Sequence, residues 1–151
     1  METFIVRWRP FTTAVQLFSR TEGSPLLECE VAGTILQVLE RTGPYLSAPG
    51  EARMILNFTT DRLEVVSARQ KRIESTGIGA ARVAGVVLLR EEDMVVVDGG
   101  APLVVGVHES LADSVAAGDF VLFDAVPPIH GFLVSSDARG SRSRAPDDEQ
   151  M

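Results

Sequence analysis

The sequence predicts a mainly β protein whose best-defined part, residues 83–134, is a small barrel of five strands with one short helix. Three observations support this prediction. Short valine-rich runs are separated by glycine, proline and acidic turns, which is typical of strands. The spacing of apolar residues changes to a helical period only once in this stretch. The chain of 151 residues is 45% hydrophobic, enough for a core in one domain or two small ones.

The first three strands of this stretch follow one another with little chain between them. The acidic turn Glu91-Glu92-Asp93 separates the first from the second, which makes the pair a hairpin candidate. Asp98-Gly99-Gly100 can supply the positive φ angles of a tight reversal before the third. The predicted strands are residues 83–90, 94–97 and 103–108.

A helix is predicted after the third strand, over residues 110–117. Ser110 can cap its N-terminus and Gly118 can end it. Two further strands are predicted at residues 120–123 and 132–134, with Pro127-Pro128 ending the first of them. The helical period is carried by Leu111, Ala112, Val115 and Ala116.

This order of elements resembles the OB-fold, a five-stranded Greek-key barrel that often binds oligonucleotides. Gly85 bends the first strand, and Gly118-Asp119 leads into the fourth. The resemblance lies in VAGVV, DGG and AAGDFVLF, covers about a third of the chain and indicates a fold without a specific family. It implies nucleic-acid contact across strands 2 and 3 and through the loops joining strands 1 to 2 and 4 to 5.

The residues at those positions suit a protein partner better than single-stranded nucleic acid. The first loop is acidic and repels phosphate. The two strands offer no aromatic side chain on which bases could stack; their apolar residues are Met94, Val96, Leu103, Val105 and Val107. The second loop, residues 126–131, is apolar and nearly uncharged. The predicted protein-interface residues are therefore Glu91, Glu92, Asp93, Pro127, Pro128 and Ile129.

The N-terminal residues 1–75 are predicted to be β-rich, either as a separate lobe or as extra strands on the barrel. Three or four strands are expected from the alternation of residues 4–9, 14–19 and 26–39. Residues 53–58 could pair with residues 62–66 as a hairpin, which we favour over a helix at residues 61–72. The barrel then takes residues 76–135, and residues 136–151 form a polar tail that we expect to be disordered. VAGTIL at residues 31–36 recurs as VAGVVL at residues 83–88, through duplication or, in our preferred interpretation, chance.

Charge is distributed unevenly along the chain. The formal charges of residues 1–75, 76–135 and 136–151 are 0, −6 and −1, within a total of −7, so the barrel is the acidic part. Basic residues cluster once, where they form either a phosphate-binding edge or a solvated linker. Trp8 is either a stacking residue or, in our preferred interpretation, a core residue between two solvated arginines. The candidate nucleic-acid-binding residues are Arg7, Trp8, Arg9, Arg62, Arg69, Lys71, Arg72 and Arg82.

The residues that usually carry chemistry are few. His108 and His130 have no ligand spacing that demands a metal, and we expect neither a metal nor a cofactor. Cys29 stands alone, so it can form neither an internal disulfide nor a cysteine zinc site. No phosphate-binding glycine loop or nucleophile motif is present, and we expect no enzymatic activity.

Three functions remain open. The favoured one is a small noncatalytic adaptor that binds proteins in a complex handling nucleic acid, with any direct nucleic-acid contact made by the N-terminal region. The second is an acidic inhibitor or immunity-type module for a basic partner. The third is an enzyme with a small-molecule pocket. Neither a membrane span nor a secretory leader is evident, so we expect an intracellular protein, cytoplasmic or, in a eukaryote, nuclear.

Overall fold

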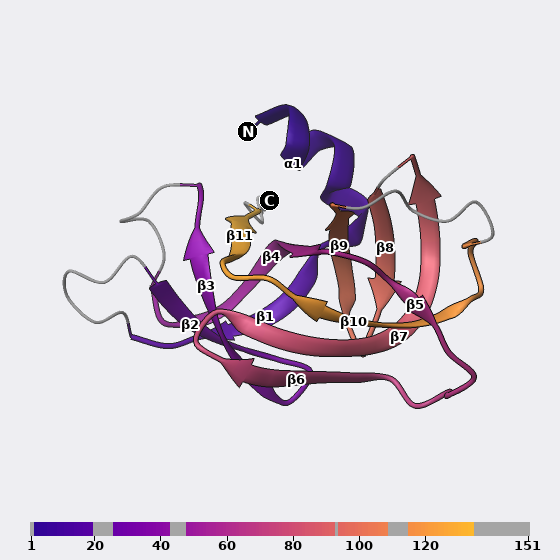
Figure 1. Ribbon diagram of the computed structural model, residues 1–151. Helices are drawn as coiled ribbons and strands as arrows, with labels where there is room; N and C mark the ends of the chain where they lie inside the picture. The colour runs from indigo at the N-terminus through magenta and orange to yellow at the C-terminus, as the bar shows by residue number, and fades with distance from the viewer. Residues whose placement is uncertain (1, 20–25, 43–47, 93, 109–114, 135–151) are drawn as a thin grey trace.

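The computed structural model describes residues 2–19, 26–42, 48–92, 94–108 and 115–134 (Figure 1). The described chain is mainly β, as predicted, with a helix only near its N-terminus. The helix is α1 (Glu2–Trp8), which continues as the 3-10 turn η1 (Arg9–Phe11). The strands are β1 (Thr13–Leu17), β2 (Leu26–Val31), β3 (Thr34–Glu40), β4 (Gly50–Thr60), β5 (Glu64–Val65), β6 (Arg72–Gly77), β7 (Ala80–Glu91), β8 (Met94–Asp98), β9 (Pro102–Val107), β10 (Phe120–Ala125) and β11 (Ile129–Leu133).

Five of these strands form a closed, mixed barrel in the order β4, β9, β8, β7, β10 and back to β4. β4 is parallel to β9, and the other pairings are antiparallel. The predicted strands at residues 83–90, 94–97, 103–108 and 120–123 are confirmed as β7 to β10. The prediction for the fifth barrel strand was wrong. The strand near residues 132–134, β11, pairs with β3 and β4 instead, and β4 closes the barrel.

β4 closes the barrel in place of β11, and it is long enough for its two halves to have different neighbours. Its first half pairs with β1 and β11, and its second half pairs with β9 and, at Thr60, with β10. The strands β1, β2, β3, β11 and β4 consequently form a second circuit of pairings that shares β4 with the barrel. One hydrophobic cluster lies inside both circuits and draws on both sides of residue 75, for example Leu36, Phe58, Val83 and Phe123.

The helix positions differ from the prediction. Residues 109–114 lie outside the described residues, but Val115 and Ala116, the end of the predicted helix, are not helical. Residues 4–9, predicted as a strand from their alternation, belong instead to α1 and the start of η1. The apolar residues Phe4, Trp8 and Phe11 also fit a helical stripe, and this stripe packs on the outside of the barrel. Burial of that stripe decides between two periods that a short sequence supports equally.

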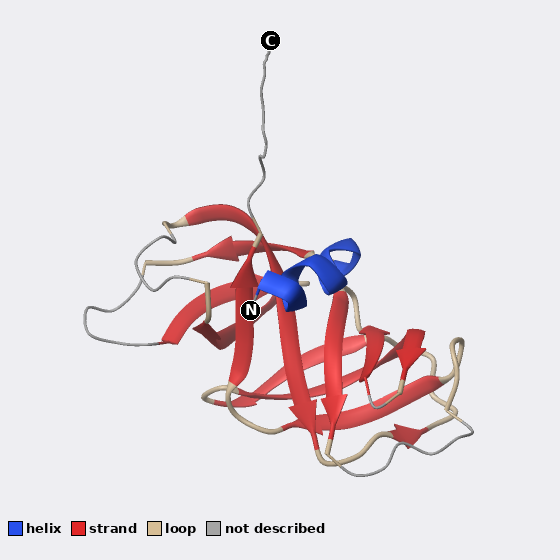
Figure 2. Cartoon of the chain, turned by 90° about the horizontal axis from the view of Figure 1, so that it is seen from above, coloured by secondary structure: helices blue, strands red, loops and turns tan. Residues whose placement is uncertain are grey.

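α1 lies across the outer face of the sheet, as Figure 2 shows. Its apolar stripe packs on a cluster of side chains that point away from the barrel interior, namely Ile55, Val96, Val104 and Phe132. The Phe4 ring centroid is 4.7 Å from that of Phe132 and 6.4 Å from that of Trp8. α1 therefore fills the outer surface that β8 and β9 would otherwise expose.

The stretch between β4 and β6 also differs from both predictions for it. It contains no helix over residues 61–72, and β5 pairs with β10 rather than folding back on β4. β5 continues along β10 from the point where Thr60 of β4 pairs with Ala125. β4 pairs with β10 only at Ala125, so β5 can pair with the rest of that edge of β10. Residues 64–65 are then no longer available for the predicted hairpin with β4.

The two VAG sequences take different structures. Residues 31–36 run from the end of β2 through a two-residue turn into β3, whereas residues 83–88 lie within β7. In β7, Gly85 packs against the chain between β8 and β9, where an added Cβ would lie 2.7 Å from the Asp98 carbonyl carbon and 2.9 Å from the Gly99 Cα. Only glycine fits this approach without a backbone shift.

Candidate binding surfaces

The aromatic and basic residues at the N-terminus are engaged within the molecule. Trp8 is 1% exposed, so its indole cannot stack on a base. Arg7 places its guanidinium 4.5 Å from the centroid of the Trp8 ring and forms a 2.6 Å ion pair with Glu91. Arg9 is exposed, and its guanidinium makes no interaction with the described residues. Of these three candidates for nucleic-acid contact, only Arg9 remains available.

The face of β8 and β9 that the OB resemblance singles out is not open. Met94 and Val96 point outward, where α1 covers them together with Val104. Leu103 and Val105 point into the core, and Val107 is also buried. The five apolar residues of these strands therefore divide between two sides of the sheet, as the alternation along a strand requires.

Two further predicted basic residues are paired. Lys71 Nζ lies 2.7 Å from Asp98 Oδ2, and Arg82 Nε lies 2.9 Å from Asp124 Oδ1. Burial raises the pKa of Asp98, but the bonds from Lys71 and the Gly100 N–H outweigh it and leave that pKa below its usual value. The hydrogen bond from Arg82 likewise lowers the pKa of Asp124. These pairs cancel charge locally, although exposed ion pairs add little stability.

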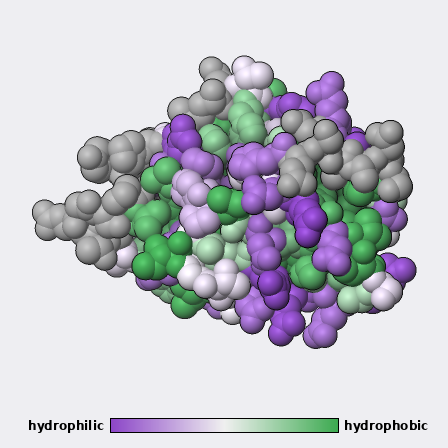
Figure 3. Space-filling model, in the orientation of Figure 1, coloured by the Kyte–Doolittle hydropathy of each residue, from purple (hydrophilic) through white to green (hydrophobic). Residues whose placement is uncertain are grey.

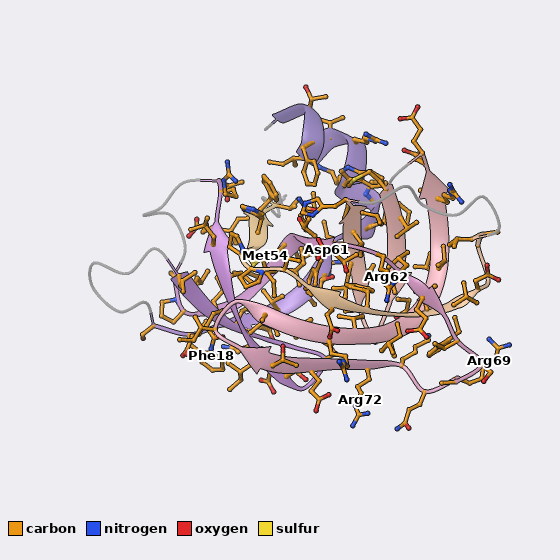
Figure 4. All side chains as sticks on the ribbon, viewed as in Figure 1. Phe18, Met54, Asp61, Arg62, Arg69 and Arg72 are labelled. Carbon is orange, nitrogen blue, oxygen red and sulfur yellow. The ribbon has the colours of Figure 1, made fainter. Side chains whose placement is uncertain are left out.

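Three other predicted cations are free. The guanidinium groups of Arg62, Arg69 and Arg72 are exposed and make no hydrogen bond or ion pair with the part of the chain that the structure describes. Figure 4 shows Arg69 at the right-hand end of the molecule, Arg72 on its lower edge and Arg62 nearer the middle. All three lie on the stretch that leads from the end of β4 to β6.

The acidic character of residues 76–135 is partly offset in three dimensions. Glu91, Asp98 and Asp124 each face a cation, and two of those cations, Arg7 and Lys71, come from the N-terminal half of the chain. Glu92 is exposed, and Asp93 lies outside the described residues. The acidic loop therefore offers a partner less charge than its sequence indicates.

An apolar tip forms where the turn between β6 and β7 meets the chain between β10 and β11. Ile78, at this turn, is 76% exposed, the largest value among the exposed large hydrophobic residues described. A Cβ added to Gly79 would lie 3.6 Å from the Pro127 Cβ, which places the two segments side by side. Pro127 and Pro128 are exposed, but Ile129 is fully buried in the core and cannot contact a partner.

The sequence contained a signal for this tip that the prediction did not use. Ile78 stands between Gly77 and Gly79 in the sequence. A large apolar residue flanked by two glycines at a hairpin turn has no strand face to occupy, so exposure could have been expected.

The two histidines lie in different surroundings. His108 Nδ1 is 3.1 Å from Asp61 Oδ1, whereas His130 Nδ1 is 3.1 Å from Arg41 Nη1. Burial and then the charge of Arg41 lower the pKa of His130, so the neutral imidazole can accept a bond from the guanidinium. Burial raises the pKa of the Cys29 thiol to about 12. Within the described ranges, no three His, Cys, Asp or Glu residues gather as a metal site would require.

Comparisons with family models, curated proteins and solved structures found no match to this chain. Among the described helices, none combines the length and the apolar character needed to cross a membrane. The surfaces above are therefore the basis for assigning a function.

Proposed function

We propose that the protein is a noncatalytic adaptor that binds another protein through its apolar tip, within a complex that handles nucleic acid. The observation that carries this proposal is the exposure of Ile78 in a turn whose next residue, Gly79, packs against Pro127 and Pro128. A side chain of this size gains about 1.5–3 kcal/mol on full burial, which a docking partner could supply.

The surroundings of the tip suit a protein interface. The less exposed apolar residues Ala80 and Val126 adjoin the turn and the proline loop in sequence. Next to them, Glu74, Arg82 and Asp124 occupy one row across β6, β7 and β10. An apolar centre with a charged rim is the usual anatomy of such an interface.

The nucleic-acid part of the proposal comes from an OB-like interpretation of the barrel. The OB-fold is a five-stranded Greek-key barrel. Here β7, β8, β9 and β10 take positions one to four, and β4 lies between β9 and β10, parallel to β9. The pairing order supports an OB-like barrel whose fifth strand comes from an earlier part of the chain.

Copurification from the source cells tests the tip, with the variant Ile78→Asp compared against wild type. We expect this variant to lose a protein that wild type retains, because the new carboxylate would have to be buried at the interface. Val6→Asp is a matched control, since Val6 is 65% exposed on α1. Equal recovery of all partners by Ile78→Asp and wild type, with both folded by circular dichroism, would count against the proposal.

One observation favours an acidic inhibitor or immunity-type module as a second candidate. Gln16 of β1 has Glu30 on one side and Glu51 on the other, in register, and both carboxylates are exposed. Neither forms an ion pair with the described residues. Association with a basic partner through this face should slow steeply as salt rises, and a salt-independent association rate would exclude it.

A further inference from the structure

The stretch from Arg62 to Arg72 is a cationic strip on an acidic protein. It carries four basic residues and one acidic residue, Glu64, within a chain of net charge −7. The middle of the lower edge of the face in Figure 3 is hydrophilic, and Figure 4 places Arg72 on the lower edge of the molecule. At physiological salt the Debye length is about 8 Å, so carboxylates elsewhere on the molecule oppose an anion at this strip only weakly.

The structure separates the free cations of the strip from the neutralised one. Lys71 is held by Asp98, whereas Arg62, Arg69 and Arg72 are exposed with unoccupied guanidinium groups in the described structure. The nearest acid along the chain to Arg62, Asp61, faces His108 instead. Three arginines thus hold five N–H donors each in water, ready for an acceptor.

The composition of the strip indicates which anion it fits. Guanidinium groups match phosphate oxygens with two parallel bonds, which makes arginine the preferred residue for phosphate recognition. Residues 67–72 are all exposed and include no large apolar residue, and Val65, which is 52% exposed, is the one exposed large apolar side chain of the strip. A stable protein interface needs an apolar centre, which a single valine does not provide. Binding of a polyanion does not require an apolar centre, because the release of its condensed counterions when arginines neutralise the phosphates supplies the free energy.

We infer that Arg62, Arg69 and Arg72 contact the phosphate backbone of nucleic acid without base specificity. The described part of the strip has no aromatic residue on which a base could stack, and α1 covers the alternative face on β8 and β9. This inference deepens the proposed function, and it uses a surface separate in sequence from the tip that holds Ile78.

Anisotropy of a labelled oligothymidylate of about 20 nucleotides, titrated with the full chain at rising salt, tests the inference. Three phosphate contacts to a single strand predict that log K falls with log salt with a slope of about −2. Each of Arg62→Gln, Arg69→Gln and Arg72→Gln should reduce the magnitude of that slope by about 0.7, and the triple variant should abolish most binding. Oligoadenylate should bind with similar affinity, because the backbone alone is contacted.

Lys71→Gln and Arg82→Gln are the matched controls, because each removes one positive charge that is already paired. They should leave the salt slope unchanged even if the affinity falls slightly. Absence of binding by wild type at about 20 mM salt, or a triple variant that binds like wild type, would overturn the inference. Stronger binding to polyglutamate than to the oligonucleotide would assign the strip to an acidic protein instead. Ile78→Asp should bind oligonucleotide normally, so failure here is distinct from failure of the tip.

Discussion

Replacement of Gly85 by alanine tests the packing of the barrel most sharply. The new Cβ would overlap the Asp98 carbonyl group and lie 2.9 Å from the Gly99 Cα, and both neighbours are backbone. No side-chain rotation can relieve this contact, so β7 must move away from the turn between β8 and β9. Overpacking of this kind costs about 1–3 kcal/mol. In a domain of this size that loss lowers Tm by about 2–12 °C.

Urea unfolding followed by circular dichroism measures the cost as a lower midpoint at unchanged slope. Gly77→Ala is the matched control, because its Cβ would meet only the Ala80 Cβ, at 4.0 Å. Both substitutions make the same Gly→Ala change to the unfolded chain, so their difference isolates the native contact. Equal midpoints for the two variants would refute the argument that β7 approaches this turn so closely.

Two further predictions concern titratable groups. Burial and the charge of Arg41 lower the pKa of His130 below 6.5 in the native protein, so the unfolded chain binds more protons near that pH. The free energy of unfolding should therefore fall as pH drops through 6.5 and level off below the native pKa. Urea titrations of His130→Gln should show a flatter pH dependence than those of His108→Gln, and identical curves would contradict this cause. The Cys29 thiol, fully buried with a pKa of about 12, should react with a disulfide reagent at mildly alkaline pH only as fast as the protein unfolds. Rapid reaction of the native protein would show that this strand is more open than described.

The local order of strands was predictable from the sequence, but the partner that closes the barrel was not. Runs such as Met94–Asp98 carry their own signal in β-branched residues and turn chemistry. The choice between β4 and β11 depends on contacts between residues far apart in the chain, and both strands carry apolar residues that suit a barrel. Only the packing of β4 against β9 and β10 decides it.

The N-terminal helix shows why periodicity fails in short segments. Residues 4–9 alternate well enough for a strand, yet Phe4 and Trp8 are also one helical turn apart. The outer face of the barrel, centred on Val104, supplies the apolar surface that favours the helix. A single sequence does not reveal that such a face exists.

The candidate sites were predictable as residue types but not as available groups. Sequence placed Arg7, Lys71 and Arg82 in the same class as Arg69 and Arg72. Their carboxylate partners lie 27 to 84 residues away in the chain, so only the fold distinguishes paired cations from free ones. The sequence also did not reveal which apolar residues near the tip are exposed, since Ile129 is buried and Ile78 is not.

The central claim is that α1 occupies the outer face of β8 and β9, so that partners bind elsewhere on the molecule. Trp8 is the one tryptophan of the chain, and as the last residue of α1 it is 1% exposed against the sheet, which makes its fluorescence a direct probe. We predict a blue-shifted Trp8 emission that acrylamide quenches poorly and that stays unchanged when oligothymidylate saturates the protein. An emission like that of the unfolded chain, or quenching of Trp8 by the bound oligonucleotide, would contradict this claim.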